Sequence, residues 1–158
     1  MLSKPHPGSP LRLDHPLAQG LVGAWPMWEG AGTTVYDATG QGNNGTLTSM
    51  DPATDWVGTP YGMGLDFDGH NDFLSFGGII GPVPTGLTLT VIASPANLTD
   101  NRYVTGGDGG GGSSNDCCLL CGYQDNCWNL VHNNFYPTAT PSQTQMAATL
   151  GWQVVTYS

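Results

Sequence analysis

The chain has 158 residues, a length at which one domain with a single hydrophobic core is expected. Only 3 residues are Lys or Arg against 12 Asp or Glu, and the net charge of −9 excludes nucleic acid and anionic membranes as partners. Hydrophobic residues reach 39%, and together with 24 Gly and 12 Pro they predict an ordered, loop-rich protein.

Residues 1–17 are expected to form an extended arm, because four prolines (Pro5, Pro7, Pro10 and Pro16) prevent a regular helix. Lys4 and Arg12 against Asp14 give this arm a net charge of +1, which leaves −10 for the remaining residues. The arm is therefore either a tether to an acidic surface or a frayed terminus. It lacks the apolar segment of a secretory signal peptide, and no run of the chain predicts a membrane helix.

The remaining residues predict short β-strands, because apolar residues alternate with polar ones between Gly, Asn and Asp turns. Residues 64–67 and 72–76 are expected to pair as a hairpin around the turn at residues 68–71. The other predicted strands are residues 21–27, 33–36, 46–48, 86–93, 102–105, 127–132 and 152–157, and residues 146–150 form one helical turn at most. The fold class is all-β, an antiparallel β-sandwich.

Several motifs between residues 20 and 77 follow one another in a recognisable order. They are Trp25, the turn Glu29-Gly30-Ala31-Gly32, Tyr36-Asp37, the turn Gly42-Asn43-Asn44-Gly45 and the segment from Leu65 to Phe73. Their order resembles that of laminin-G-like, concanavalin-A-like jelly-roll domains. The resemblance covers residues 18–158 and implies a sandwich that is incomplete at its C-terminal end, since further strands are usual in that family. A partner subunit or larger assembly would complete it, and a shortened, self-sufficient sandwich is the alternative.

Carboxylate and amide oxygens gather in two of the predicted turns, and such oxygens are the ligands that Ca²⁺ prefers. The resemblance also implies calcium, which relatives often bind. The candidate ligands are Asp37, Asn43, Asp66, Asp68 and Asp72. The alternative is that these side chains only stabilise turns by accepting backbone hydrogen bonds.

Four cysteines, Cys117, Cys118, Cys121 and Cys127, lie within a predicted Cys- and Gly-rich loop at residues 106–128. Two disulfides are the favoured interpretation, with three pairings open. A zinc site built on Cys118, Cys121 and His132 is the rival interpretation.

The sequence does not predict an enzyme. Glu29 is the only glutamate, and neither the carboxylate pair of a glycosidase nor a nucleophile-elbow motif is recognisable. Aromatic residues suit sugar stacking instead, and the candidate glycan-binding residues are Tyr123, Asn126, Trp128 and Asn129.

The start of the domain, from His15 to Trp25, resembles laminin-G-like domains of phage structural proteins. This resemblance implies a virion surface or decoration protein that assembles with other particle subunits, as a homo-oligomer, at the virion or extracellular surface. A carbohydrate-binding module, with or without calcium, is the alternative function, and a glycoside hydrolase ranks below it.

Overall fold

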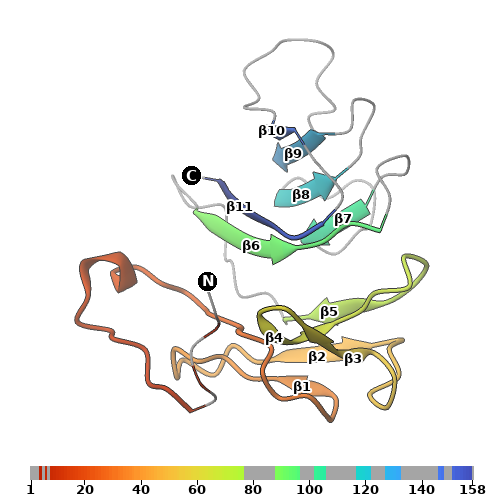
Figure 1. Ribbon diagram of the computed structural model, residues 1–158. Helices are drawn as coiled ribbons and strands as arrows, with labels where there is room; N and C mark the ends of the chain where they lie inside the picture. Colours follow the sequence, from red (N-terminus) through yellow and green to blue (C-terminus); the bar gives the residue numbers. More distant parts are fainter. Residues whose placement is uncertain are drawn as a thin grey trace. The chain divides into compact units, whose positions relative to one another are not determined.

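The computed structural model describes residues 4, 6, 8–76, 88–96, 102–105, 117–121, 127–132, 146–147 and 151–157. The chain divides into two compact units, Met1–Ile79 and Ile80–Ser158, and each is described by itself (Figure 1). Apart from one turn of 3-10 helix, all regular structure in the described residues is β-strand. Within these residues, no helix has the length and apolar character needed to cross a membrane.

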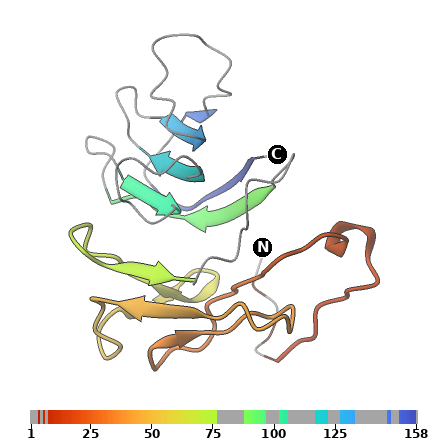
Figure 2. The same ribbon diagram turned by 180° about the vertical axis from the view of Figure 1, so that it is seen from behind.

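The first unit contains a three-stranded sheet and a separate hairpin. After the 3-10 turn η1 (Pro16–Ala18), the sheet forms in the order β1–β2–β5, and β3 pairs with β4 (Figure 2). The strands are β1 (Thr34–Val35), β2 (Gly45–Thr48), β3 (Trp56–Thr59), β4 (Gly62–Leu65) and β5 (Phe73–Ser75). All of these pairs are antiparallel.

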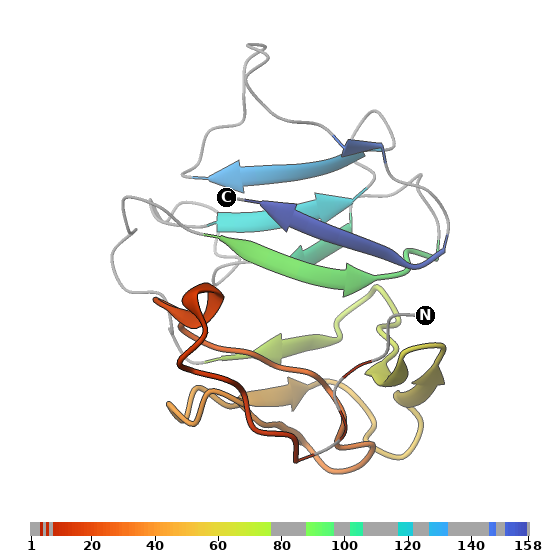
Figure 3. The same cartoon turned by 60° about the vertical axis from the view of Figure 1, so that its left-hand side comes forward.

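The second unit contains two further antiparallel sheets. One pairs β6 (Leu89–Ala93) with β11 (Gln153–Tyr157), which lie side by side in Figure 3. The other has the order β10–β9–β8–β7. Its strands are β7 (Arg102–Thr105), β8 (Cys117–Cys121), β9 (Cys127–His132) and β10 (Met146–Ala147).

The all-β, antiparallel character predicted from the sequence is confirmed for the described residues. The hairpin expected from residues 64–67 and 72–76 is wrong, because β4 pairs with β3 and β5 pairs with β2. The turn between them therefore carries the chain from one sheet to another. Residues 21–27 form no strand, and residues 146–147 form β10 rather than a helical turn. β8 lies within the stretch expected to be a loop.

The core of the first unit lies on one face of the β1–β2–β5 sheet. Val35, Leu47, Met50 and Trp56 are buried, and Trp25, Met27, Met63, Leu65 and Leu74 pack against them. The alternation of side chains along a strand explains this arrangement, since Val35 and Leu47 point inward while Thr34 and Thr46 lie on the other face. Gly45, opposite Val35 in the ladder, leaves room for the ring of Phe76, which lies 4.4 Å from that of Trp25 between centroids.

Candidate functional site

Asp37 is the most heavily hydrogen-bonded side chain of the first unit. It is 8% exposed and lies two residues after the end of β1. Its Oδ1 accepts hydrogen bonds from the N–H groups of Ala24 (3.1 Å) and Thr39 (2.9 Å). Its Oδ2 accepts from the Thr39 hydroxyl (2.6 Å) and the Asn43 N–H (3.3 Å). One carboxylate thus joins the segment before β1 to the Gly-rich loop after it.

The electrostatics of Asp37 follow from these contacts. Burial raises the pKa of the carboxyl, but the hydrogen bonds from Thr39, Ala24 and Asn43 outweigh it and hold the pKa below its usual value. Asp37 is therefore ionised at neutral pH and acts as a fixed acceptor. A general acid working at neutral pH needs the opposite shift.

Side chains of the loop after β1 also hold the segment that was expected to be a strand. Gln41 Nε2 donates to the Leu21 carbonyl (2.6 Å), and Asn43 Nδ2 donates to the Val22 carbonyl (2.7 Å). Trp25 Nε1 donates in turn to the Asn43 carbonyl (2.7 Å). Side chains of this loop and backbone groups of Ala18 and Ala38, rather than a neighbouring strand, thus bind the backbone groups of Leu21, Val22 and Ala24.

The carboxylates of the second predicted turn are organised around Asp68. Its Oδ1 accepts from the N–H groups of His70 (2.7 Å) and Asn71 (3.3 Å), while Asp72 Oδ2 accepts from the Asp68 N–H (2.9 Å). The His70 hydrogen bond is the main cause that lowers the pKa of Asp68. Asp66 is exposed, and its N–H donates to the Asp55 carbonyl. These are contacts of a side-chain-stabilised turn.

Of the predicted calcium ligands, the structure brings Asp37 and Asn43 together in one loop and Asp68 and Asp72 in another. In the described part of the chain, no three His, Cys, Asp or Glu side chains gather as a metal-binding group. A cation at Asp37 would have to displace donors that already occupy both oxygens. Calcium binding stays a prediction.

The predicted glycan-binding and cysteine residues belong to the second unit. Tyr123 and Asn126 lie outside the described residues. Trp128 stands opposite Cys121 in the β8–β9 ladder, and Asn129 stands opposite Leu120. Cys117 and Cys118 lie opposite His132 and Val131, and Cys127 stands opposite Ala147 of β10. Glycan binding there, the disulfides and the zinc alternative all stay predictions.

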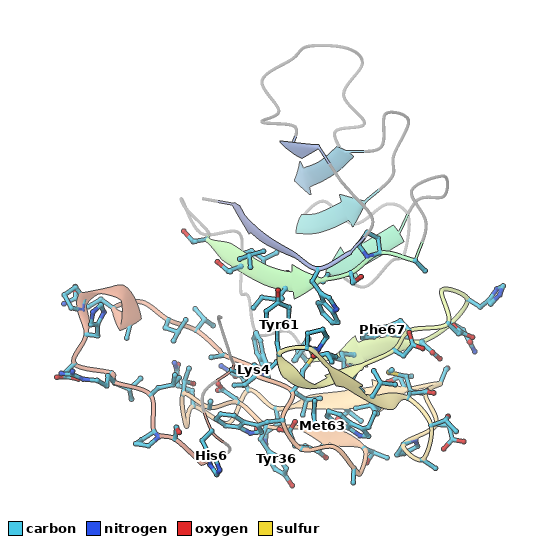
Figure 4. The ribbon with its side chains drawn as sticks, viewed as in Figure 1. Lys4, His6, Tyr36, Tyr61, Met63 and Phe67 are labelled. Carbon is cyan, nitrogen blue, oxygen red and sulfur yellow. The ribbon has the colours of Figure 1, made fainter. Side chains whose placement is uncertain are left out.

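Lys4 occupies a site that the sequence did not reveal. Its Nζ donates to the carbonyls of Met63 and Met27 (3.4 Å for the latter), and its N–H donates to the Tyr61 carbonyl (3.4 Å). Its stem lies over Gly62, where an added Cβ would be 3.7 Å from Lys4 Cδ. Figure 4 shows Lys4 beside Tyr61 and Met63. We call the residues around the Lys4 backbone, stem and ammonium the Lys4 socket. They are Met27, Glu29, Tyr61, Gly62 and Met63.

The Lys4 socket is shaped for a cation. Burial lowers the pKa of Lys4, and the negative charge of Glu29 partly offsets this effect. Glu29 Oε1 accepts from the Tyr36 N–H (2.9 Å), while its Oε2 is buried without a hydrogen-bond partner in the described residues. Met27 has a left-handed φ of 54°, which is uncommon for a residue with a side chain and costs about 1 kcal/mol or more. Its carbonyl is one of those that bind the ammonium.

From the sequence, Lys4 was expected in an arm that is either a tether to an acidic surface or a frayed terminus, whereas in the structure it binds carbonyls of this chain's own first unit. The other base of the arm, Arg12, pairs with Asp14 at 3.0 Å in an exposed ion pair. No pattern in the neighbouring sequence distinguishes Lys4, which binds the first unit, from Arg12, which pairs within the arm. The one sequence feature that could have indicated the Lys4 socket is Glu29, because it is the only glutamate of the chain and its charge acts on Lys4.

Comparisons of this chain with protein-family models, with curated proteins and with solved structures find no match.

Proposed function

We propose that the protein is a non-catalytic structural subunit of a particle surface, such as a decoration protein of a virion, built on a laminin-G-like jelly-roll sandwich. The observation that carries this proposal is the docked N-terminal arm. Lys4 fastens the arm to the first unit, while the segment that follows includes an exposed apolar side chain, Leu13. An anchored arm with an outward loop suits attachment between subunits.

The use of the carboxylates supports the same proposal. Asp37 holds two segments together, and Glu29 binds the Tyr36 N–H beside the Lys4 socket. Both side chains are thus employed in positioning the backbone. The acidic surface would keep such a subunit soluble and leave its contacts with other particle subunits to arms and loops.

Association in solution tests the proposal. We expect sedimentation velocity of the full chain, from about 1 µM to about 100 µM, to show a reversible species of two or more copies, because subunits that assemble through their own surfaces associate as their concentration rises. The same run in 1 M NaCl separates apolar contacts from charged ones, since screening then leaves only short-range attraction. A single monomeric species at every concentration would contradict the proposal.

A second candidate function, binding of a neutral glycan, is favoured by the outer face of the β1–β2–β5 sheet. This face carries Thr34, Thr46, Thr48, Phe73 and Ser75, and Tyr36 continues it beyond β1. Tyr36 and Phe73 are 57% and 50% exposed. Neighbouring positions of the three strands carry Thr34, Thr46 and Ser75. Their hydroxyl groups therefore lie between the rings of Tyr36 and Phe73. None of these side chains is charged, which suits a neutral sugar chain.

Affinity electrophoresis in gels that contain hydroxyethyl cellulose, xylan or galactomannan tests this second candidate. We expect retardation by at least one of them, and a loss of about tenfold in affinity for Tyr36→Ala or Phe73→Ala. Phe67→Ala is the matched control, because Phe67 is 44% exposed but follows β4 of the other sheet (Figure 4). Binding that only Trp128→Ala removes would place the glycan site on β9 instead.

A further inference from the structure

The segment that joins Lys4 to the rest of the first unit is bounded by two glycines. Gly8 and Gly20 have left-handed φ values of 81° and 77°, and an added Cβ at either would have no atom within 4 Å. Both positions therefore need glycine for its backbone freedom rather than for space. A change of backbone angles at these two points would swing residues 9–19 as one piece.

Hydrogen bonds within this segment are local. The N–H groups of Leu13 and His15 donate to the carbonyls of Leu11 and Arg12, and the Ser9 N–H donates to His6. The Arg12–Asp14 ion pair also lies within the segment. The Ser9–His6 bond spans Gly8, and the Leu21 N–H donates to the Ala18 carbonyl across Gly20. Rotation at the two glycines exchanges these two bonds for bonds to water, while the contacts inside the segment travel with it.

The contacts of the Lys4 socket, by contrast, join residues far apart in the chain. The carbonyls of Met27 and Met63 lie 23 and 59 positions from Lys4. The socket recognises an ammonium on an unbranched stem that passes over Gly62, together with the backbone N–H at the base of that stem. Nothing in this recognition depends on the ammonium coming from the same chain.

We propose that the Lys4 socket is an arm-exchange site, in which the Lys4 of a second copy of this chain replaces the chain's own Lys4 when copies assemble. This inference rests on the proposed function as an assembling subunit and names the contact that joins the copies. Since the same contacts form within a chain and between chains, concentration decides which arrangement prevails. The 11 residues from 9 to 19 can span up to about 35 Å when extended, which is enough to reach a neighbour.

A labelled arm peptide tests whether the socket accepts Lys4 from another molecule. The probe is a peptide of residues 1–10 with fluorescein at its C-terminal end, added to a chain that lacks residues 1–7. We expect saturable binding by fluorescence anisotropy, and binding at least tenfold weaker for the Lys4→Met peptide. Glu29→Gln in the chain should also weaken binding, whereas Asp14→Asn should not. No binding of the unmodified peptide would overturn the exchange.

Sedimentation of three full-length chains and the truncated chain completes the test. We expect the wild type and Arg12→Met to associate, and Lys4→Met and the chain lacking residues 1–7 to remain monomeric while keeping the wild-type circular dichroism spectrum. If the chain lacking residues 1–7 associated as strongly as the wild type, arm exchange would be overturned, but the proposed function would still hold. A wild-type chain that is monomeric at every concentration would overturn both.

Discussion

Trp56→Ala is expected to destabilise the first unit by about 4 kcal/mol. Trp56 is 8% exposed and packs in the core with Val35, Leu47 and Met50. Its Nε1 also donates to the Gly32 carbonyl at 2.9 Å. Alanine would leave a cavity where the indole stood, and the loss is comparable with the whole stability of a small domain. Urea denaturation followed by far-UV circular dichroism measures it.

Two further variants separate the contributions at this position. Trp56→Phe keeps most of the ring and loses the hydrogen bond to Gly32, so a loss of about 1–2 kcal/mol is expected. Trp152→Ala is the control, because that Trp is 39% exposed and lies in the second unit. If Trp56→Ala cost no more than Trp152→Ala, Trp56 would not belong to the core of the first unit.

Asp37→Asn is expected to cost about 3 kcal/mol at neutral pH. The substitution keeps the size of the side chain but replaces an acceptor oxygen by an NH₂ group. That group would face donors, the N–H groups of Ala24 and Thr39 on one side or the Thr39 hydroxyl and the Asn43 N–H on the other. Hydrogen bonds to a charged acceptor are worth more than neutral ones, and a buried donor left unsatisfied adds a penalty.

The dependence of this effect on pH follows from the lowered pKa of Asp37. Because the folded-state pKa lies below the ordinary value of 3.8, the carboxylate contributes its full stabilisation above that value and loses it as the pH falls through the folded-state pKa. The difference in unfolding free energy between wild type and Asp37→Asn should therefore be constant near neutrality and shrink in acid. Urea denaturation at a series of pH values measures it.

Asp66→Asn serves as the matched control, because Asp66 is an exposed carboxylate close to another turn. It should change the unfolding free energy by less than about 0.5 kcal/mol. A difference for Asp37→Asn that grows as the pH falls would mean that the Asp37 carboxylate does not carry the stabilisation assigned to it.

Much of the local structure could be predicted from the sequence because it depends on neighbours in the chain. Residues 127–132 and 102–105 were predicted as strands, and β9 and β7 have these bounds. The Asp68 turn was recognisable as well, since an Asp side chain that binds the N–H groups of residues two and three positions later needs only local geometry.

The site could be predicted only in part. Asp37 was singled out, with calcium binding and turn stabilisation left as alternatives, because the sequence cannot show whether a carboxylate faces solvent or backbone amides. β3 was missed because its residues, Trp56–Thr59, lie in a turn-rich segment. The expected hairpin around Asp68 failed because a turn residue does not determine which strands the chain joins.

The sequence by itself determined the all-β class and the turns that Asp and Asn hold. Only the tertiary structure decided that β4 pairs with β3, that Asp37 is buried among four donors, and that Lys4 turns back onto its own unit. The reason is physical. Alternation and turn chemistry are set within a few residues, whereas strand pairing and the burial of a charge depend on groups up to 59 positions apart.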